Sequence, residues 1–431
     1  MPILDGAPAV TQFRIETSGD IIHFIFDLPD RSMNVFSNKA IHELDAFSTW
    51  LKGADAKGVV VRSGKESAFC AGADLTELGV AYDMIIAARP EDRFDLAFDH
   101  FFPLSRAIRK LERSGKPVAA AIAGLALGGG CELALGAHYR VLADSPAAAL
   151  GLPESLVGLL PGAGGTQRLP RLVGLDVAIP MLLEGARLSG EDALKAGLIN
   201  EVASPSTEVE CAERWVRNAE EVRQPWDEPG FAPPVVLDVA QELAPLREKI
   251  LSQTLGHYPA PLAILDCIEQ GLPQSFDAAI RTEMSIFSHL IQRREPKNMI
   301  GTLFLAKGAY DRAKKKNSVP EAVSTAVEAM ARHLDVHRNS PSLRRAGFWP
   351  SEGPRAPVQS QVAESYWFQT SSDPQAEEAR ELIDQIAVAA RDAAAGLTQD
   401  EKSMADYVIV KEHGFPAYLG GPFALSEEIE A

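Results

Sequence analysis

The sequence predicts an α/β domain followed by an all-helical C-terminal region. In the first half, short β-branched runs alternate with amphipathic stretches, a pattern typical of parallel strands connected through helices. From about Thr207 the strand pattern fades, and residues 235–316 show the three- and four-residue apolar spacing of successive helices. We therefore expect a core over residues 1–206, a helical extension over 207–316 and a helical region over 317–431, with a linker near 341–375.

The expected elements follow the chain in that order. Strands are expected at Ile21–Phe26, Gly58–Arg62, Val118–Ile122 and Tyr139–Ala143. Helices are expected at Asn38–Lys52, Phe101–Ser114, Pro320–Leu334 and Ala376–Ala395. The charged stretch Leu75–Phe98 shows weaker periodicity, and we expect it to be a mobile segment.

Composition excludes several classes of partner. The chain has 431 residues and a net charge of −17, from 42 Lys+Arg against 59 Asp+Glu. That acidic balance disfavours binding to nucleic acid or to an anionic membrane, and no apolar run approaches the ~18 residues that span a bilayer. The four cysteines are scattered and the N-terminus lacks a signal-peptide pattern, so we expect a cytoplasmic protein with reduced thiols.

Two segments place backbone amides beside small residues. The first, Ser67–Asp74 (SAFCAGAD), follows a predicted strand, and its glycine and alanines would let N–H groups approach a ligand closely. The second, Gly124–Leu135 (GLALGGGCELAL), runs from a strand through three consecutive glycines into a helix that carries Glu132. Free amides at a helix start lie at the positive end of its dipole and therefore suit a developing oxyanion.

A third segment, Gly151–Leu169 (GLPESLVGLLPGAGGTQRL), surrounds a second carboxylate, Glu154, with apolar residues that would raise its pKa. Taken alone, a glycine triplet is usually a tight turn, and a glutamate at a helix start usually complements the dipole. Together the segments supply what addition of water to an activated double bond needs. One carboxylate activates water, the other delivers a proton to carbon, and the amides stabilise the enolate-like oxygen between them.

These segments resemble a known family. SAFCAGADL, IAGLALGGGCELAL and LGLPESLVGLLPGAGGTQRLPRLVG resemble the three signature segments of the crotonase (enoyl-CoA hydratase/isomerase) family. LSGEDALKAGLINEV, QPWDEPGF, YPAPLAILDCIEQG and SFDAAIRTEMSIFSHL further resemble the hydratase/isomerase half of the multifunctional fatty-acid oxidation α subunit. The likeness covers roughly residues 10–316. It implies a crotonase-like ββα spiral core and an acyl-CoA substrate.

The resemblance also implies roles for individual residues. Glu132 matches the glutamate that activates water, and Glu154 matches the one that transfers the α-carbon proton. The oxyanion hole falls on the backbone amides of Ala73 and Gly129. Further contacts with the CoA ester are implied for Ala71, Gly72, Asp74, Leu75, Gly128, Gly130, Pro153 and Gly162. The implied reaction is syn hydration of 2-enoyl-CoA to 3-hydroxyacyl-CoA, with no cofactor except the coenzyme A of the substrate.

Three alternatives stay open. The same carboxylates could move a proton between the α and γ carbons, as in a Δ3–Δ2 enoyl-CoA isomerase, and the fold also supports acyl-CoA hydrolases. Family isomerases often manage with the second glutamate alone, and family hydrolases typically lack a glutamate directly after the glycine triplet. Glu132 therefore favours a hydratase. The third alternative is a non-catalytic subunit of a fatty-acid oxidation complex.

Beyond residue 316 the sequence departs from the multifunctional pattern. There a nicotinamide-dependent dehydrogenase follows, but no Gly-x-Gly-x-x-Gly occurs in this chain, so we expect no NAD binding. Ala376–Glu428 instead resembles the end of the multifunctional chain. His333 and His337 lie one helical turn apart without a third ligand at motif spacing, and we expect no metal site. The family suggests a trimer or hexamer, or a thiolase-type partner subunit.

Overall fold

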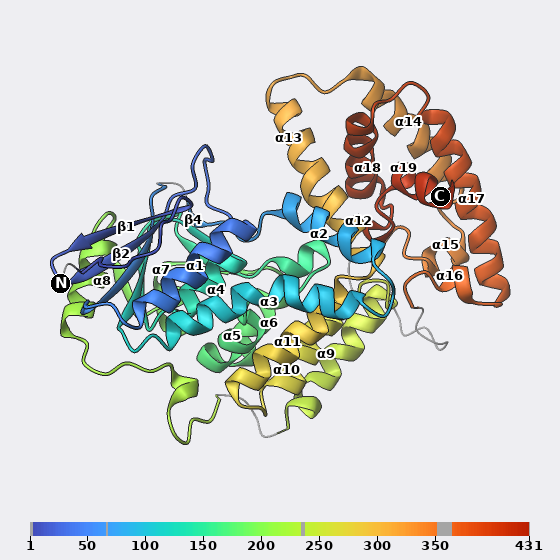
Figure 1. The fold of residues 1–431 in the computed structure, drawn as a ribbon. Coiled ribbons are helices and arrows are strands. Elements are labelled where there is room, and N and C mark those ends of the chain that lie inside the picture. Colours follow the sequence, from blue (N-terminus) through green and yellow to red (C-terminus); the bar gives the residue numbers. More distant parts are fainter. Residues whose placement is uncertain (1–2, 66–67, 234–237, 351–363, 431) are drawn as a thin grey trace. The chain divides into compact units, whose positions relative to one another are not determined.

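The fold is given by a computed structural model, which describes residues 3–65, 68–233, 238–350 and 364–430 (Figure 1). The chain forms two compact units. Unit 1 comprises Met1–Glu242 and Ala263–Gln292, and unit 2 comprises Leu243–Leu262 and Arg293–Ala431. The boundaries expected near residues 206 and 316 remain predictions about domain organisation.

Unit 1 is built on two sheets. The six-stranded sheet has the order β1-β2-β3-β5-β7-β10, in which β1 and β2 are antiparallel and the other neighbours are parallel. Its strands are β1 (Phe13–Ser18), β2 (Ile21–Phe26), β3 (Gly58–Ser63), β5 (Val118–Ile122), β7 (Tyr139–Ala143) and β10 (Glu201–Ala203). The four-stranded sheet has the order β4-β6-β8-β9, with strands β4 (Ala68–Cys70), β6 (Leu125–Leu127), β8 (Ala149–Gly151) and β9 (Arg187–Leu188).

Successive strands of unit 1 alternate between the two sheets in a repeating pattern. The successive pairs β3–β4, β5–β6 and β7–β8 each give one strand to the six-stranded sheet and the next strand to the four-stranded sheet, before the chain turns into helices. This is the ββα spiral that the resemblance implied. Residues 13–18 were not expected as a strand, and neither were the short strands of the second sheet, because three-residue strands are too brief to show a period.

Helices cover the faces of the six-stranded sheet. Helix α8 (Glu208–Asn218) packs on one face through Cys211, Ala212 and Val216, against Val60 and Ala119 of the strands. Helices α1 (Asn38–Leu51) and α3 (Arg93–Glu112) lie side by side (Figure 1). The helices of unit 1 are α1 (Asn38–Leu51), α2 (Leu75–Ala87), α3 (Arg93–Glu112), α4 (Gly129–Leu135), η1 (Glu154–Val157), α5 (Gly165–Val173), α6 (Leu175–Leu183), α7 (Gly190–Lys195), α8 (Glu208–Asn218), η2 (Pro225–Asp227) and α11 (Phe276–Leu290).

The stretch Leu75–Phe98, whose weak periodicity suggested a mobile segment, is largely helical, because α2 and the first part of α3 occupy it. The side chain of Asp74 caps α2 by accepting hydrogen bonds from the amides of Thr76 and Glu77. Leu78, Ala81, Tyr82 and Ile85 form its buried face, and the charged residues that obscured the pattern lie mostly on the solvent side.

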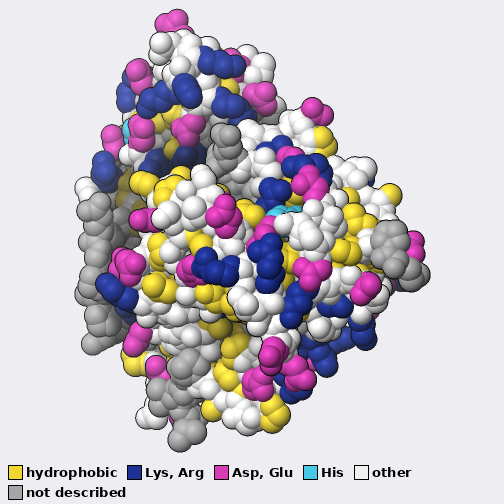
Figure 2. All heavy atoms as spheres, turned by 90° about the vertical axis from the view of Figure 1, so that its left-hand side faces the viewer, with side chains coloured by type: hydrophobic (Ala, Val, Ile, Leu, Met, Phe, Trp, Pro, Cys, Tyr) yellow, Lys and Arg dark blue, Asp and Glu magenta, His cyan; other side chains and the backbone are white. Residues whose placement is uncertain are grey.

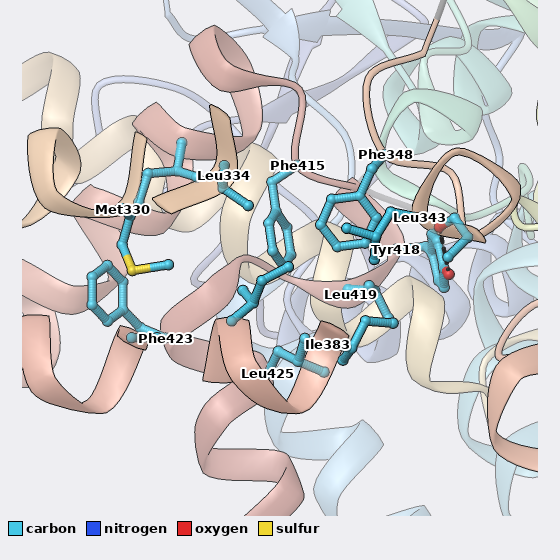
Figure 3. Packing of buried hydrophobic residues seen from close by; sticks show 14 of the residues in the cluster. Met330, Leu334, Leu343, Phe348, Ile383, Phe415, Tyr418, Leu419, Phe423 and Leu425 are labelled. Carbon is cyan, nitrogen blue, oxygen red and sulfur yellow. Dashed lines mark hydrogen bonds between the residues drawn. The ribbon is translucent and has the colours of Figure 1, made fainter. Parts of the chain in front are cut away.

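Unit 2 is helical, as the sequence predicted, and has its own core. Met330, Leu334, Phe348, Phe415 and Phe423 point into a common interior (Figure 3). Helices α9 (Val239–Thr254) and α10 (Pro259–Gly271) belong partly to each unit. Within unit 2 alone lie α12 (Arg294–Ile300), the π-helix η3 (Gly301–Ala306), α13 (Lys307–Lys315), α14 (Glu321–Val336), α15 (Pro341–Arg345), α16 (Trp367–Thr370), α17 (Pro374–Ala393), α18 (Gln399–His413), η4 (Ala417–Leu419) and α19 (Pro422–Glu430).

The linker expected near 341–375 falls partly on residues 351–363, which lie outside the described residues. On either side of them the chain forms the short helices α15 and α16 rather than an extended connection. The helices expected at Pro320–Leu334 and Ala376–Ala395 are confirmed as α14 and α17.

The described surface carries charges of both signs. On the face drawn in Figure 2, basic and acidic side chains are interspersed among apolar ones. None of the helices in the described ranges combines the length and the apolar character that crossing a membrane requires.

Candidate active site

Three neighbouring strands of the second sheet bring the chemistry-bearing segments together. Strands β4, β6 and β8 are adjacent and parallel, so the residues that follow them emerge at one edge of the sheet. The backbone after β4 passes close to that after β6, because a Cβ placed on Gly72 would lie 3.7 Å from Gly128 Cα and 3.8 Å from the Gly129 nitrogen. Ser67, at the start of the first predicted segment, lies outside the described residues.

The amides of Ala73 and Gly129, which were predicted as oxyanion donors, lie in the segments that follow β4 and β6. Phe36 forms a parallel bridge with Ala73 through hydrogen bonds to the two flanking residues, which turns the N–H of Ala73 away from Phe36. Gly129 is the first residue of α4, where an N–H has no intrahelical acceptor. Within the described ranges neither amide donates to a protein group, so both could bind a substrate oxygen.

Glu132 is a buried carboxylate with strong donors. Its side chain, in α4, is 2% exposed, and Oε1 accepts hydrogen bonds from the amides of Ala163 and Gly165, both at 2.7 Å. Burial raises the pKa of Glu132 from 4.5 to about 7, while the two amides and the charge of Arg168 oppose that rise by favouring the ionised form.

Glu154 lies in a different environment. It begins η1, and although the residue is partly exposed, its Oε2 is buried without a hydrogen-bond partner among the described residues. Its Oε1 faces Gly128, where a Cβ would lie only 2.8 Å away; Gly128 also has a φ of +52°. Burial, followed by the negative charges of Glu132 and Glu283, raises the pKa of Glu154 well above 4.5.

The two carboxyl groups, those of Glu132 and Glu154, therefore differ in how readily they ionise. Glu132 has donors that stabilise its anion and ionises first. Glu154 has no such donors on Oε2, and the anion of Glu132 disfavours a second charge nearby. A pair whose surroundings separate their pKa values in this way can provide one base and one acid at neutral pH.

A third buried glutamate, Glu283, was missed by the sequence reasoning. It lies in α11, where Oε1 accepts a hydrogen bond from the Gly164 amide at 2.6 Å, and Oε2 accepts one from the Thr166 amide at 3.0 Å. The Thr166 hydroxyl lies 2.5 Å from Oε2. Burial, and then the charge of Glu132, raise the pKa of Glu283 to about 8.

A signal for Glu283 was present in the sequence. The predicted helix carries an apolar stripe at Ala279, Ile280, Met284 and Phe287, and Glu283 is the charged residue on that buried face. A charge at a core position of a helix usually has a dedicated partner.

Arg168, which the sequence reasoning also missed, is fully buried and contacts the segment 163–166 that donates to the two glutamates. Its Nε donates to Glu112 at 2.7 Å, and its Nη1 donates to the carbonyl oxygen of Ala163 at 2.7 Å. The ion pair satisfies both buried charges, and the hydrogen bond to the Ala163 carbonyl fixes the peptide unit that carries the Gly164 amide.

The other residues expected to contact substrate are placed as follows. Gly72 and Gly128 lie where the first two segments meet, and Gly130 packs against the Cys70 backbone, where a Cβ would collide. Asp74 caps α2 and pairs with Arg31 at 3.2 Å, so its carboxylate has structural partners. The remaining positions are Ala71, whose amide donates to Asn34, Leu75 at the start of α2, Pro153 before η1, and Gly162 facing the Phe287 ring.

In the part of the chain that the structure describes, no group of three or more His, Cys, Asp or Glu side chains has an arrangement that could hold a metal ion. The rings of His333 and His337 lie 5.2 Å apart in unit 2. All four cysteines are free and buried, and Cys131, next to Glu132, packs in the core.

Comparison with known proteins identifies related sequences. Residues 16–226 match the family model described as enoyl-CoA hydratase/isomerase. The fatty acid oxidation complex subunit alpha of Shewanella frigidimarina is 33% identical over 307 residues, which cover 69% of this chain and 41% of that protein. Its counterpart in Shewanella oneidensis is 31% identical over 311 residues, covering 70% and 42%. The matched part thus spans about two fifths of these relatives.

Solved structures of enoyl-CoA hydratases also match. That from Bacillus anthracis is 25% identical, with a TM-score of 0.42, and the match covers 72% of this chain and 98% of that one. That from Bacillus halodurans is 20% identical, with a TM-score of 0.47, covering 67% and 99%. The matched residues 16–226 contain most of the two-sheet ββα core. This chain therefore belongs to the crotonase (enoyl-CoA hydratase/isomerase) family.

Proposed function

We propose that this chain hydrates 2-enoyl-CoA thioesters to 3-hydroxyacyl-CoA in fatty-acid or related acyl-CoA degradation. The observation that carries the proposal is the contrast between the two carboxyl groups beside two unpaired amides. Glu132 accepts two backbone hydrogen bonds, whereas Oε2 of Glu154 accepts none among the described residues. The description of the matched family, enoyl-CoA hydratase/isomerase, supports an acyl-CoA substrate, and the names of the curated relatives support a place in fatty acid oxidation. No cofactor is needed beyond the coenzyme A of the substrate.

In the proposed mechanism each carboxyl group and the pair of amides has its own role. Ionised Glu132 takes a proton from water as the water oxygen bonds to the β carbon of the enoyl group. The electron pair of the double bond shifts towards the thioester oxygen, where the amides of Ala73 and Gly129 stabilise the developing negative charge. Protonated Glu154 then delivers its proton to the α carbon. The cycle closes when Glu132 returns a proton to Glu154 through water.

The test follows the loss of enoyl-thioester absorbance on crotonyl-CoA and on a longer 2-enoyl-CoA. Glu132→Gln and Glu154→Gln should each lower kcat by about 10²–10⁴-fold, the usual contribution of a positioned acid or base. Glu43→Gln is the matched control, because Glu43 is a buried glutamate of unit 1 that accepts hydrogen bonds from the amides of Thr11 and Gln12. Its kcat should stay near wild type. An inert wild-type protein that still binds CoA esters would contradict hydration while leaving the family intact.

One observation favours a second activity, the Δ3–Δ2 isomerisation of enoyl-CoA. Shifting a double bond requires one group that removes and returns a proton, and Oε2 of Glu154 is free of partners for that task among the described residues. Glu132→Gln separates the two reactions, because it should abolish hydration while retaining isomerisation of a 3-enoyl-CoA. Equal loss of both activities would argue against an isomerase carried by Glu154 alone.

A further inference from the structure

The loop 163–166, which leads into α5 and includes its first two residues, divides its backbone amides between two glutamates. The amides of Ala163 and Gly165 donate to Oε1 of Glu132, both at 2.7 Å. The amides between and after them, from Gly164 and Thr166, donate to Glu283 at 2.6 and 3.0 Å. Successive N–H groups therefore point alternately at a carboxyl group of the active site and at one outside it.

This alternation depends on small residues at the centre of the loop. Gly164 has a φ of +95°, a conformation that residues with a side chain rarely adopt. A Cβ on Gly165 would lie 2.9 Å from Oε1 of Glu132, closer than real contacts allow. The backbone thus approaches both carboxyl groups directly, and no side chain of the loop mediates between it and Glu132.

We propose that Glu283 is a positioning residue, which holds Gly164 and Thr166 so that the neighbouring amides stay directed at Glu132 and keep it ionisable as the base. The inference rests on the proposed function, in which Glu132 is that base. Without Glu283 the amides of Gly164 and Thr166 would lose their acceptor inside a buried site, and the loop would rotate to satisfy them.

The protonation of Glu283 suits this task. Burial raises the pKa of Glu283 to about 8, which favours its neutral form near neutral pH. A neutral carboxylic acid still offers oxygen lone pairs to the two amides and to the Thr166 hydroxyl. Glu283 can therefore fix the loop without placing a second negative charge beside the base.

The test compares Glu283→Ala and Glu283→Gln with Glu43→Ala. Glu43 offers a matched control because it also accepts two successive amides and a threonine hydroxyl, those of Thr11 and Gln12. Two or three amide hydrogen bonds lower a carboxyl pKa by about 2 units. If Glu132 loses part of its two amide hydrogen bonds, its pKa rises. The acid limb of the pH profile of kcat/KM should therefore move up by about one pH unit in Glu283→Ala, which lowers kcat/KM at pH 6 about tenfold.

Glu283→Gln keeps one oxygen acceptor and no charge, so its acid limb should lie between wild type and Glu283→Ala. Glu43→Ala should lose stability without moving the limb. Infrared titration of the protonated carboxyl band of Glu132, identified by its loss in Glu132→Gln, gives the same comparison without turnover. An inert wild type would contradict the proposed function, whereas the infrared midpoint still decides the role of Glu283.

An unchanged Glu132 midpoint in a folded Glu283 variant would overturn the proposal and leave Glu283 a purely structural residue. If Glu283→Ala does not fold, Glu283→Gln decides by the same measurement. A midpoint that also moves in Glu43→Ala would equally overturn it, because the effect would then reflect general loosening of unit 1.

Discussion

Replacing Glu132 by glutamine should make unit 1 more stable while it removes activity. Folding raises the pKa of Glu132 from 4.5 to about 7, so the folded state binds this proton more tightly than the unfolded chain does. The contribution of the group to stability is therefore greatest below pH 4.5 and is lost as the pH rises through about 7. The rise corresponds to about 3 kcal/mol against folding at pH 8.

Glutamine removes that cost and keeps the local hydrogen bonds. Both amides donate to a single oxygen of Glu132, Oε1, and a glutamine carbonyl can accept both in the same place. Relative to wild type, the gain in the free energy of unfolding should be about 1 kcal/mol or less at pH 5 and about 3 kcal/mol at pH 8. The comparison between two pH values cancels any constant effect of the new amide.

Urea unfolding at the two pH values provides the assay, read through hydrogen–deuterium exchange of peptides from β5 and β7, which belong to unit 1. A gain that is equal at pH 5 and pH 8 would refute the reasoning, because it would show that Glu132 ionises as readily in the folded as in the unfolded chain. A net loss at pH 8 would show that the amides need a charged acceptor.

The remaining predictions concern turnover, the loop geometry and unit 2. With crotonyl-CoA, wild-type kcat/KM should fall about tenfold for each pH unit below about 7, as Glu132 takes up its proton; a flat profile from pH 5 to 8 would exclude Glu132 as the base. Gly128→Ala should lower kcat/KM at least about tenfold and cost about 1–3 kcal/mol, measured by urea unfolding, because its Cβ would press on Glu154 and its φ is +52°. Phe348→Ala should cost unit 2 about 3–5 kcal/mol by hydrogen exchange, since Phe348 is fully buried; a cost below about 1 kcal/mol would show that the cluster closes around the gap.

Most of the core could be predicted from the sequence because its strands are continuous apolar runs. Residues 21–26, 118–122 and 139–143 are strands with the expected bounds, since a strand buried on both faces is apolar at nearly every position; His23 and Arg140 are the buried exceptions. The short strands of the second sheet were not predicted, although they position the segments of the candidate site. Their three residues show no periodicity, and only pairing in space reveals them.

The site was predictable where its residues follow one another closely in sequence. Glu132 and Glu154 stand beside recognisable glycine-rich turns, and the structure places them at one edge of one sheet. Their roles remain predictions. Glu283 was out of reach because it meets Gly164 across 119 residues. Periodicity can mark such a residue as anomalous but cannot name its partner.

The segment Ala263–Gln292 returns to unit 1 after the chain has begun unit 2. During synthesis, all the strands of both sheets leave the ribosome before α11 does, so the sheets can pair while the loop 163–166 still lacks half of its acceptors. Competence for catalysis would then arise as a late and separate event, after most of the core is in place. Nascent chains stalled before and after α11 would differ little in sheet content and sharply in turnover.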